Sequence, residues 1–261
     1  MTVLAAERQA KIVQEIQRRG AARVADLVDL FGVSDMTIRR DLDALAQQGL
    51  IDKVHGGATR RARSTHEPGF EAKSAQQRAE KEAIALTAAQ EVAPGAAIGL
   101  SAGTTTWTLA RRLREVPGLT IVTNSIRIAD LLYSTDGPEQ NVVLTGGVRT
   151  PSDALVGPLA VNSLRTLHLD AVFLGVHGID PGAGFTTPNL LEAETDRALI
   201  AASRRLVVLA DHTKWQVVGI STVVPLADAD LVVTDDRLPM DARAQLQDHV
   251  LDVKIAQVKH N

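Results

Sequence analysis

Residues 21–57 read AARVADLVDLFGVSDMTIRRDLDALAQQGLIDKVHGG, and this stretch decides the fold of the N-terminal part of the chain. A first helix is predicted by apolar residues at helical spacing, namely Val24, Leu27, Val28, Leu30 and Phe31. Gly32 ends this helix, because glycine tolerates the left-handed backbone of many helix C-termini, and Ser34 suits the N-cap of a second helix. That second helix has an apolar stripe at i, i+4 and i+7, formed by Ile38, Leu42 and Leu45.

The second helix carries polar and basic residues away from its apolar stripe, which is typical of a helix-turn-helix. In that motif the N-terminal residues of the second helix contact base edges in the major groove. Arginine suits this task, since its planar guanidinium bonds guanine or clamps a phosphate. Residues 50–57 (LIDKVHGG) predict a short hairpin with a glycine tip, which would form a wing beside the sugar-phosphate backbone. The residues expected to contact DNA are Ser34, Met36, Thr37, Arg39, Arg40, Lys53, His55 and Gly56.

An all-α packing unit is the alternative, because amphipathic helices joined at a glycine are common and paired arginines often lie on solvated faces. The distribution of charge favours DNA binding. Residues 1–63 carry a net charge of +3 and the remainder −6, within a total of −3. A basic head on an acidic body is typical of a DNA-binding module attached to a different domain. Since the net positive charge of residues 1–63 is small, we expect a homo-oligomer, a dimer or tetramer, to multiply the contacts with DNA phosphates.

Composition excludes several classes of protein. The 261 residues include 45% hydrophobic and 23% charged residues, an ordinary globular balance. No apolar run approaches the roughly 20 residues of a membrane span, and the N-terminus lacks a signal-peptide core, so we expect a cytoplasmic protein without membrane contact. The absence of cysteine excludes disulfides and cysteine-ligated zinc. Because His177 and His212 lack metal-ligand spacing, we expect no metal and no cofactor.

The order of segments predicts two domains. A supporting helix is expected at 7–19, a long helix at 71–91, and a helix near 157–167. Strand-like segments alternate with helical ones in the second half of the chain, which predicts a mostly parallel α/β sheet. Its strands are expected at 96–102, 119–124, 141–147, 170–180, 205–211, 230–235 and 252–258. We therefore expect a winged helix-turn-helix domain at 1–58 (with the helix-turn-helix about 21–40), a linker at 59–75, and an effector-binding and oligomerisation domain at 76–261.

Small polar loops follow several of the predicted strands, where open α/β sheets bind ligands. The loop 101–106 (SAGTTT) enters a helix and suits an anion, because helix N-termini offer free N–H groups. Such residues are more often plain helix or turn caps, and Asp180 beside Pro181 and Gly182 fits a turn cap too. The candidate effector-binding residues are Ser101, Gly103, Thr104, Thr105, Thr106, Asn124, Gly146, Gly147, Asp180 and Lys214.

Two segments of the N-terminal part, VSDMTIRRDLDALAQQGLI (33–51) and VHGGA (54–58), resemble the DNA-binding segment of the DeoR family of bacterial transcriptional regulators. The C-terminal part resembles the effector domain of that family through GTTT (103–106), VTNS (122–125), LTGGVR (144–149), LVGPLA (155–160), FLGVHGID (173–180), GFTTPNLLEAE (184–194) and LADHTKW (209–215).

This resemblance implies a fold and a function. It implies an effector domain similar in fold to ribose-5-phosphate isomerase and CoA transferases, and an effector that is a phosphorylated sugar or a related metabolite. The loop 103–106 would hold the phosphate, and Asn124, Asp180 and Lys214 the sugar hydroxyls. It further implies a repressor of a carbohydrate uptake or catabolism operon, which the effector releases from double-stranded operator DNA.

The sequence departs from the family pattern at two places. Family members often have Asp-Ser-Gly-Thr-Thr where this chain has Ser101-Ala102-Gly103-Thr104-Thr105, and Lys-Arg where it has Asp196-Arg197. A different effector, or a pocket built from other side chains, would account for both, and the change at Asp196 is alternatively a surface change of no consequence.

An enzyme remains the alternative function. It would be a sugar-phosphate isomerase with an appended DNA-binding domain, in which Asp180 or Asp211 acts as base with Lys214 as partner.

Overall fold

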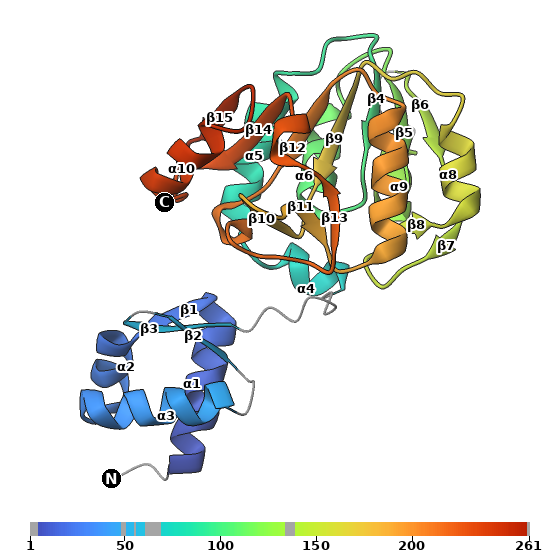
Figure 1. The fold of residues 1–261 in the computed structure, drawn as a ribbon. Coiled ribbons are helices and arrows are strands. Elements are labelled where there is room, and N and C mark those ends of the chain that lie inside the picture. The colour runs from blue at the N-terminus through green and yellow to red at the C-terminus, as the bar shows by residue number, and fades with distance from the viewer. Residues whose placement is uncertain (1–4, 48–50, 55, 61–68, 134–138, 260–261) are drawn as a thin grey trace. The chain divides into compact units, whose positions relative to one another are not determined.

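The computed structural model describes residues 5–47, 51–54, 56–60, 69–133 and 139–259 (Figure 1). The chain splits into two compact units, Met1–Arg63 and Ser64–Asn261. Each unit buries its own apolar side chains, in one cluster for the N-terminal unit and two for the C-terminal unit.

The N-terminal unit combines three helices with a small antiparallel sheet. The helices are α1 (Ala5–Arg19), α2 (Val24–Phe31) and α3 (Asp35–Gln47), and the strands β1 (Ala21–Arg23), β2 (Ile51–Val54) and β3 (Gly57–Arg60). The strand order is β1-β3-β2, so the predicted hairpin is confirmed and gains a third strand. Helices plus a winged hairpin give the predicted winged helix-turn-helix fold.

The turn between α2 and α3 forms as predicted. Gly32 lies at φ 63° and ψ 31°, and its N–H bonds the carbonyl of Val28. Ser34 accepts a hydrogen bond from the N–H of Thr37 at 3.2 Å, as an N-cap does. The prediction for Leu30 was wrong, because this residue is exposed. At about 100° per residue, Leu30 lies well off the face that Val24 and Leu27 bury.

Buried side chains fix α3 against the rest of the unit. Ile38, Leu42 and Leu45 are all buried, as the periodicity predicted. A buried ion pair joins Arg8 of α1 to Asp41 of α3 at 2.6 Å. Removing one partner of such a pair would leave an uncompensated charge, so this contact sets how α1 lies against α3.

A seven-stranded parallel sheet organises the C-terminal unit, in the order β15-β14-β12-β9-β4-β5-β6. Its strands are β4 (Ala97–Leu100), β5 (Thr120–Thr123), β6 (Asn141–Leu144), β9 (Ala171–Gly175), β12 (Leu206–Leu209), β14 (Leu231–Asp235) and β15 (Val253–Ala256). Each strand falls within a predicted segment, which confirms the mostly parallel α/β fold.

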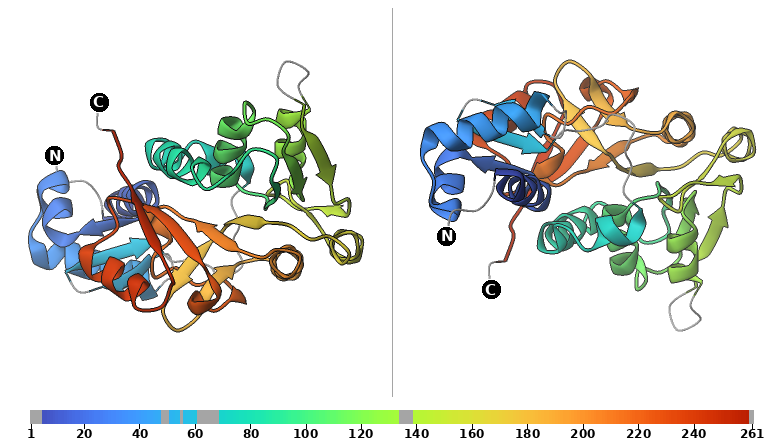
Figure 2. Two further views of the ribbon diagram at one scale, coloured as in Figure 1. Left: turned by 90° about the horizontal axis from the view of Figure 1, so that it is seen from above. Right: turned by 90° about the horizontal axis from the view of Figure 1, so that it is seen from below.

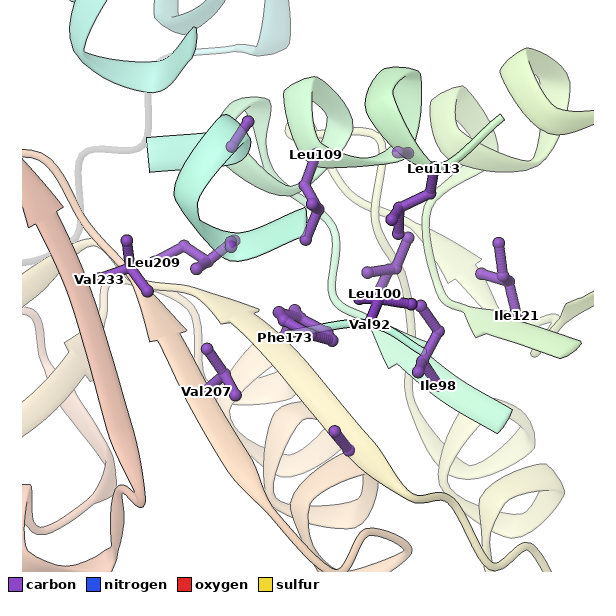
Figure 3. Packing of buried hydrophobic residues seen from close by; sticks show 14 of the residues in the cluster. Val92, Ile98, Leu100, Leu109, Leu113, Ile121, Phe173, Val207, Leu209 and Val233 are labelled. Carbon is purple, nitrogen blue, oxygen red and sulfur yellow. The ribbon is translucent and has the colours of Figure 1, made fainter. Parts of the chain in front are cut away.

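Helices cover both faces of this sheet. On one face α5 (Arg78–Ala89), α6 (Thr104–Leu113) and α7 (Ile126–Leu132) pack on a cluster that includes Leu100, Phe173 and Val207 (Figure 3). The other face is covered by α8 (Pro158–Leu164), α9 (Leu190–Ala201) and α10 (Met240–Gln247). The result is a three-layer arrangement, whose strand ends are open for a site.

Three features of this unit were not predicted. A hairpin pairs β7 (Val148–Arg149) with β8 (Leu155–Val156). A separate antiparallel sheet joins β10 (Gly178–Asp180), β11 (Gly184–Thr187) and β13 (Ser221–Val224). Two short 3₁₀ helices, η1 (His212–Lys214) and η2 (Leu226–Asp228), complete the unit.

The single helix predicted at 71–91 was also wrong, since α4 (Phe70–Ser74) is separate from α5. Gln77, between the two helices, adopts a positive φ of 49°. The amine of Lys81 donates to the carbonyls of Lys73 and Gln76 at 2.6 and 2.7 Å, which satisfies the end of α4. The linker predicted at 59–75 overlaps β3 at one end and α4 at the other, while 61–68 lies outside the described residues.

Candidate functional site

The surface of α3 presents the residues predicted to contact DNA. Met36, Arg39 and Arg40 are exposed on the side opposite the buried stripe, and Thr37 is half-buried. Arg39 forms an i,i+4 ion pair with Asp35, and this hydrogen bond raises the pKa of Arg39 and lowers the pKa of Asp35. Arg39 is thereby held along the helix surface. The arrangement leaves a basic, polar face of α3 exposed, as the predicted contact with the major groove of DNA requires.

The wing lies beside the same helix. Lys53 of β2 pairs with Asp43 of α3 at 2.6 Å, which ties the hairpin to the recognition helix. Gly56, at φ 79°, allows the turn between β2 and β3. His55 lies outside the described residues. Ser34 already uses its hydroxyl as the cap of α3, so a DNA contact by this residue stays a prediction.

A cavity in the C-terminal unit opens beyond the carboxyl ends of β4, β5, β9 and β12. Five of the predicted effector residues line it, namely Gly103, Thr104, Thr105, Asn124 and Lys214. The first N–H groups of any helix have no intrahelical partner, and at Gly103 no side chain caps those of α6. Asn124 is buried and accepts the N–H of Ala102 at 2.8 Å, which fixes the loop. The geometry of the cavity at the N-terminus of α6 is therefore compatible with the predicted anion site, which stays a prediction.

Two other predicted residues, Ser101 and Thr106, do not line the cavity but form hydrogen bonds that hold this loop. Ser101 accepts the N–H of Gly175 at 2.9 Å, and Thr106 donates to the carbonyl of Gly103 at 3.0 Å. Both side chains are buried against the sheet. Their hydroxyls hold strand and loop in place.

The remaining three predicted residues also lie away from the cavity lining. Gly146 and Gly147 have positive φ values of 75° and 122° and form the turn into β7. A side chain at Gly147 would meet the backbone of Val156. Asp180 accepts the N–H groups of Gly182 and Ala183, both at 2.9 Å, so it caps a turn. This agrees with the turn-cap interpretation of Asp180, which lies outside the cavity lining because β10 belongs to the antiparallel sheet, and an effector contact by this residue stays a prediction.

The sequence did not identify two further lysines of the cavity, Lys73 and Lys81. Burial, with Lys214 and Lys73 nearby, lowers the pKa of Lys81 to about 8, although Asp211 and Glu80 oppose this shift. A signal existed in the sequence. Lys81 occupies the stripe of α5 that Ile84, Ala85 and Ala88 bury, and a lysine on a buried stripe points to a function.

Three carboxylates also line the cavity: Glu192, Asp196 and Asp211. Glu192 accepts hydrogen bonds from the hydroxyls of Thr150, at 2.8 Å, and Ser152. Asp211 accepts from the N–H and hydroxyl of Thr213. Asp196 is buried, so the departure from the family pattern at this position changes the pocket and not the outer surface.

A histidine–aspartate pair anchors the segment that carries Lys214. Nδ1 of His212 lies 2.9 Å from Asp235, which also accepts the backbone N–H of His212 at 2.7 Å. Burial disfavours the charged ring, but the hydrogen bond and charge of Asp235, with other nearby carboxylates, outweigh it and raise the pKa of His212. These bonds tie η1 to the end of β14.

The described ranges contain neither a metal-ligand cluster nor a membrane-spanning helix. No group of three or more His, Cys, Asp or Glu side chains there could hold a metal ion. No helix among the same residues has the length and apolar character needed to cross a membrane.

Comparison with known families matches both units. Residues 8–63 match the DeoR-like helix-turn-helix domain, and residues 76–236 match the DeoR C-terminal sensor domain. Together these matches cover most of the chain and include both of its units.

Whole-length relatives are transcriptional regulators. An uncharacterised helix-turn-helix-type regulator of Escherichia coli strain K12 is 37% identical, covering 96% of this chain and 97% of the relative. A putative aga operon transcriptional repressor of Escherichia coli O157:H7 is 34% identical, covering 90% and 88%. The glycerol-3-phosphate regulon repressor of Escherichia coli strain K12 is 31% identical, covering 95% and 98%.

Among solved structures, a D-ribose-5-phosphate isomerase in complex with phospho-erythronic acid is similar over 52% of each chain, with 17% identity and a TM-score of 0.39. Nothing about function follows from a similarity this low. The relatives above are regulators and not enzymes, so the isomerase alternative is not favoured. With its helix-turn-helix, its sensor domain and its whole-length relatives, this chain belongs to the DeoR family of DNA-binding transcriptional regulators.

Proposed function

We propose that this regulator represses an operon for carbohydrate uptake or catabolism, and that a phosphorylated sugar or related metabolite releases it from operator DNA. The observation that carries the proposal is the meeting of a buried lysine, Lys81, with the uncapped N-terminus of α6 in one cavity. The names of two relatives, an aga operon repressor and a glycerol-3-phosphate regulon repressor, support the same effector class.

The phosphate end of the effector would bind at α6. Thr104 and Thr105 offer backbone N–H groups at the positive end of the helix dipole and side-chain hydroxyls beside them. Lys81 and Lys214 line the same cavity and supply positive charge against a dianion. This combination suits a phosphomonoester better than a neutral sugar, because the helix dipole and the lysine charges attract an anion more strongly than a neutral hydroxyl.

The sugar end of the effector would face hydrogen-bond acceptors of the cavity. Ionised carboxylates only accept hydrogen bonds, and Glu192 and Asp196 of α9 both line the cavity. Hydroxyl groups are donors, so these carboxylates suit the polyol part of the effector. Asn124 stays a candidate for the same role, although its amide already orients the loop.

On DNA, α3 would lie in the major groove with the wing along the backbone. Since one helix-turn-helix covers one half-site, we propose a homo-oligomer, a dimer or tetramer, that acts on chromosomal DNA in the cytoplasm. Effector binding would favour a state in which the paired units no longer match the half-site spacing. Release follows because the effector and the operator then favour different states.

Calorimetric titration with matched sugar pairs tests the effector class. The same set of sugars is offered with and without a phosphate group. We expect binding only of a phosphorylated form, and retention of this binding in Asp180→Asn, because Asp180 lies outside the cavity lining. Equal affinity for a sugar and its phosphate would refute the proposed phosphate site.

A further inference from the structure

Helix α4 is the first described helix of the C-terminal unit, and it forms part of the cavity wall. It begins at Phe70 and follows, in the chain, the segment 61–68 that connects the two units. Lys73 of α4, with Gln76 and Gln77 just after it, lines the cavity that holds the proposed phosphate site. This short segment therefore comes directly after the connection to the DNA-binding unit and also faces the effector cavity.

The C-terminal end of α4 is held by a single amine. Nζ of Lys81 donates to the carbonyl oxygens of Lys73, at 2.6 Å, and Gln76, at 2.7 Å. Carbonyls at a helix end lack the N–H groups of a following turn, so a side-chain donor stabilises them. Gln77, which has a positive φ of 49°, separates this end from α5. Lys81 therefore caps α4 from the next helix in the chain.

The N-terminal end of α4 is anchored by other contacts. The buried ring of Phe70 meets the ring of Trp107 edge to face, with centroids 5.9 Å apart. Arg127 lies 5.0 Å from the ring centroid of Phe70, and it pairs with Glu71 at 2.9 Å and with the buried Asp153 at 2.7 Å. In both views of Figure 2, the turquoise helices α4 and α5 lie beside the green helices α6 and α7, which carry Trp107 and Arg127. These five anchoring residues lie outside the cavity lining, so ligand binding acts on the other end of α4.

The amine of Lys81 serves the proposed phosphate site as well. Lys81 is buried and lines the cavity together with Thr104 and Thr105 at the N-terminus of α6. An ammonium group has three N–H donors, and the carbonyls at the end of α4 use two of them. A phosphate dianion is a stronger acceptor for an ammonium than a neutral carbonyl, because both partners then carry charge. A bound phosphate and the end of α4 therefore compete for one amine.

We infer that Lys81 is a switch shared by α4 and the phosphate of the effector, so that effector binding loosens the C-terminal end of α4. With phosphate bound, the amine turns to the anion, and the carbonyls of Lys73 and Gln76 lose their charged donor. The N–H of Lys73 bonds the carbonyl of Gly69 at 3.1 Å, so a loosened α4 also loses its hold on the start of the unit. This switch rests on the proposed function and adds the route by which an occupied cavity affects the connection to the DNA-binding unit.

Hydrogen exchange of the full-length protein, followed by mass spectrometry, tests the switch with inorganic phosphate as the probe. Sodium phosphate is compared with sodium chloride at equal ionic strength, and phosphate binding is measured separately by calorimetry. The amides of Lys73, Ala75 and Gln76 report on α4, because each bonds a carbonyl of the same segment. We expect their exchange to become about tenfold faster in phosphate, the size expected for the loss of one charge-assisted hydrogen bond.

Two lysine variants identify the group that responds. Lys81→Met keeps the apolar part of the side chain and removes the amine, so its α4 amides should exchange rapidly in phosphate and in chloride alike. Lys259→Met, at an exposed lysine beyond β15, is the matched control and should respond to phosphate as the wild type does. Circular dichroism shows whether Lys81→Met is folded, and the wild-type comparison of phosphate with chloride decides alone if it is not.

The possible results separate the switch from the proposed effector class. Phosphate that binds without faster exchange of α4 overturns the switch and leaves the effector class standing. Slower exchange, from closure of α4 on the anion through Lys73, has the same meaning. A phosphate response that persists in Lys81→Met also overturns the switch, because another group then acts on α4. A wild type that binds no phosphate contradicts both the switch and the proposed phosphate site.

Discussion

The affinity for a phosphorylated effector should depend on pH through Lys81. This lysine is buried at the cavity, and its pKa is lowered to about 8. Because the charged amine attracts the phosphate, binding is strongest below this pKa and weakens as the pH rises through it. About nine-tenths of the amine is charged at pH 7 and about one-tenth at pH 9, so the dissociation constant should rise about tenfold over this range.

The ligand itself contributes little to this change. A phosphomonoester has its second pKa near about 6, so it is mostly dianionic from pH 7 upward. A lysine with an ordinary pKa of about 10.4 would also stay charged up to pH 9 and give a flat profile. The predicted slope therefore comes from the burial of Lys81.

Calorimetric titrations at pH 7, 8 and 9 measure the effect, with a sugar phosphate that binds at pH 7. Lys81→Met should bind more weakly at pH 7 and show no slope. Lys259→Met, at an exposed lysine beyond β15, should keep the wild-type profile. A wild-type affinity that is constant from pH 7 to pH 9, or an unchanged slope in Lys81→Met, would refute the reasoning.

Three further predictions concern single positions. Arg40→Ala should raise the dissociation constant for operator DNA about 5- to 150-fold in anisotropy titrations, while Arg165→Ala, outside the DNA-binding unit, should not. Thr104→Glu places a carboxylate at the first turn of α6, where a helix tolerates it, and should give a folded repressor that sugar phosphates no longer release; full release would show that the phosphate binds elsewhere. Leu42→Ala removes a fully buried side chain and should cost about 2–5 kcal/mol, so the N-terminal unit should unfold at a lower temperature in calorimetry while the C-terminal unit is unchanged, whereas an unchanged thermogram would contradict this packing.

Local rules predicted the DNA-binding unit well. The cap residues Gly32 and Ser34 and the buried stripe of α3 follow from backbone preference and helical period, which depend on near neighbours in the chain. The third strand β1 was missed because a segment of three residues, two of them alanines, carries no strand pattern of its own. Its place is set by pairing with β3, which lies far along the sequence.

The pocket was predicted only in part, for a topological reason. Strand ends of the parallel sheet meet at one edge, so Thr104 and Asn124 were placed correctly at the cavity. Asp180 belongs to β10, which pairs in the separate antiparallel sheet. The alternation of strand-like and helical segments along the sequence does not distinguish such a strand from one of the parallel sheet. Glu192 and Asp196 enter from α9 on the other face, because that helix packs its N-terminal half near the hairpin of β7 and β8.

The sequence did not show whether Asp196 lies at the surface or in the pocket. From the resemblance alone, Asp196 in place of a lysine was compatible with a surface change of no consequence. The side chain is instead buried at the cavity, one helical turn from Glu192. The wall formed by α9 is therefore acidic, and we expect this chain to favour effectors whose sugar part donates hydrogen bonds over those that carry a second anionic group.

Control of DNA binding by a sugar phosphate is the property proposed for this regulator. Fluorescence anisotropy of labelled DNA from upstream of the gene, titrated with protein and then with a panel of sugar phosphates, tests it most directly. We expect tight, salt-sensitive binding to this DNA, weak binding to a scrambled sequence, and release by a phosphorylated sugar but not by its unphosphorylated form. Equal binding to both DNA sequences, or release by the unphosphorylated sugar, would contradict it.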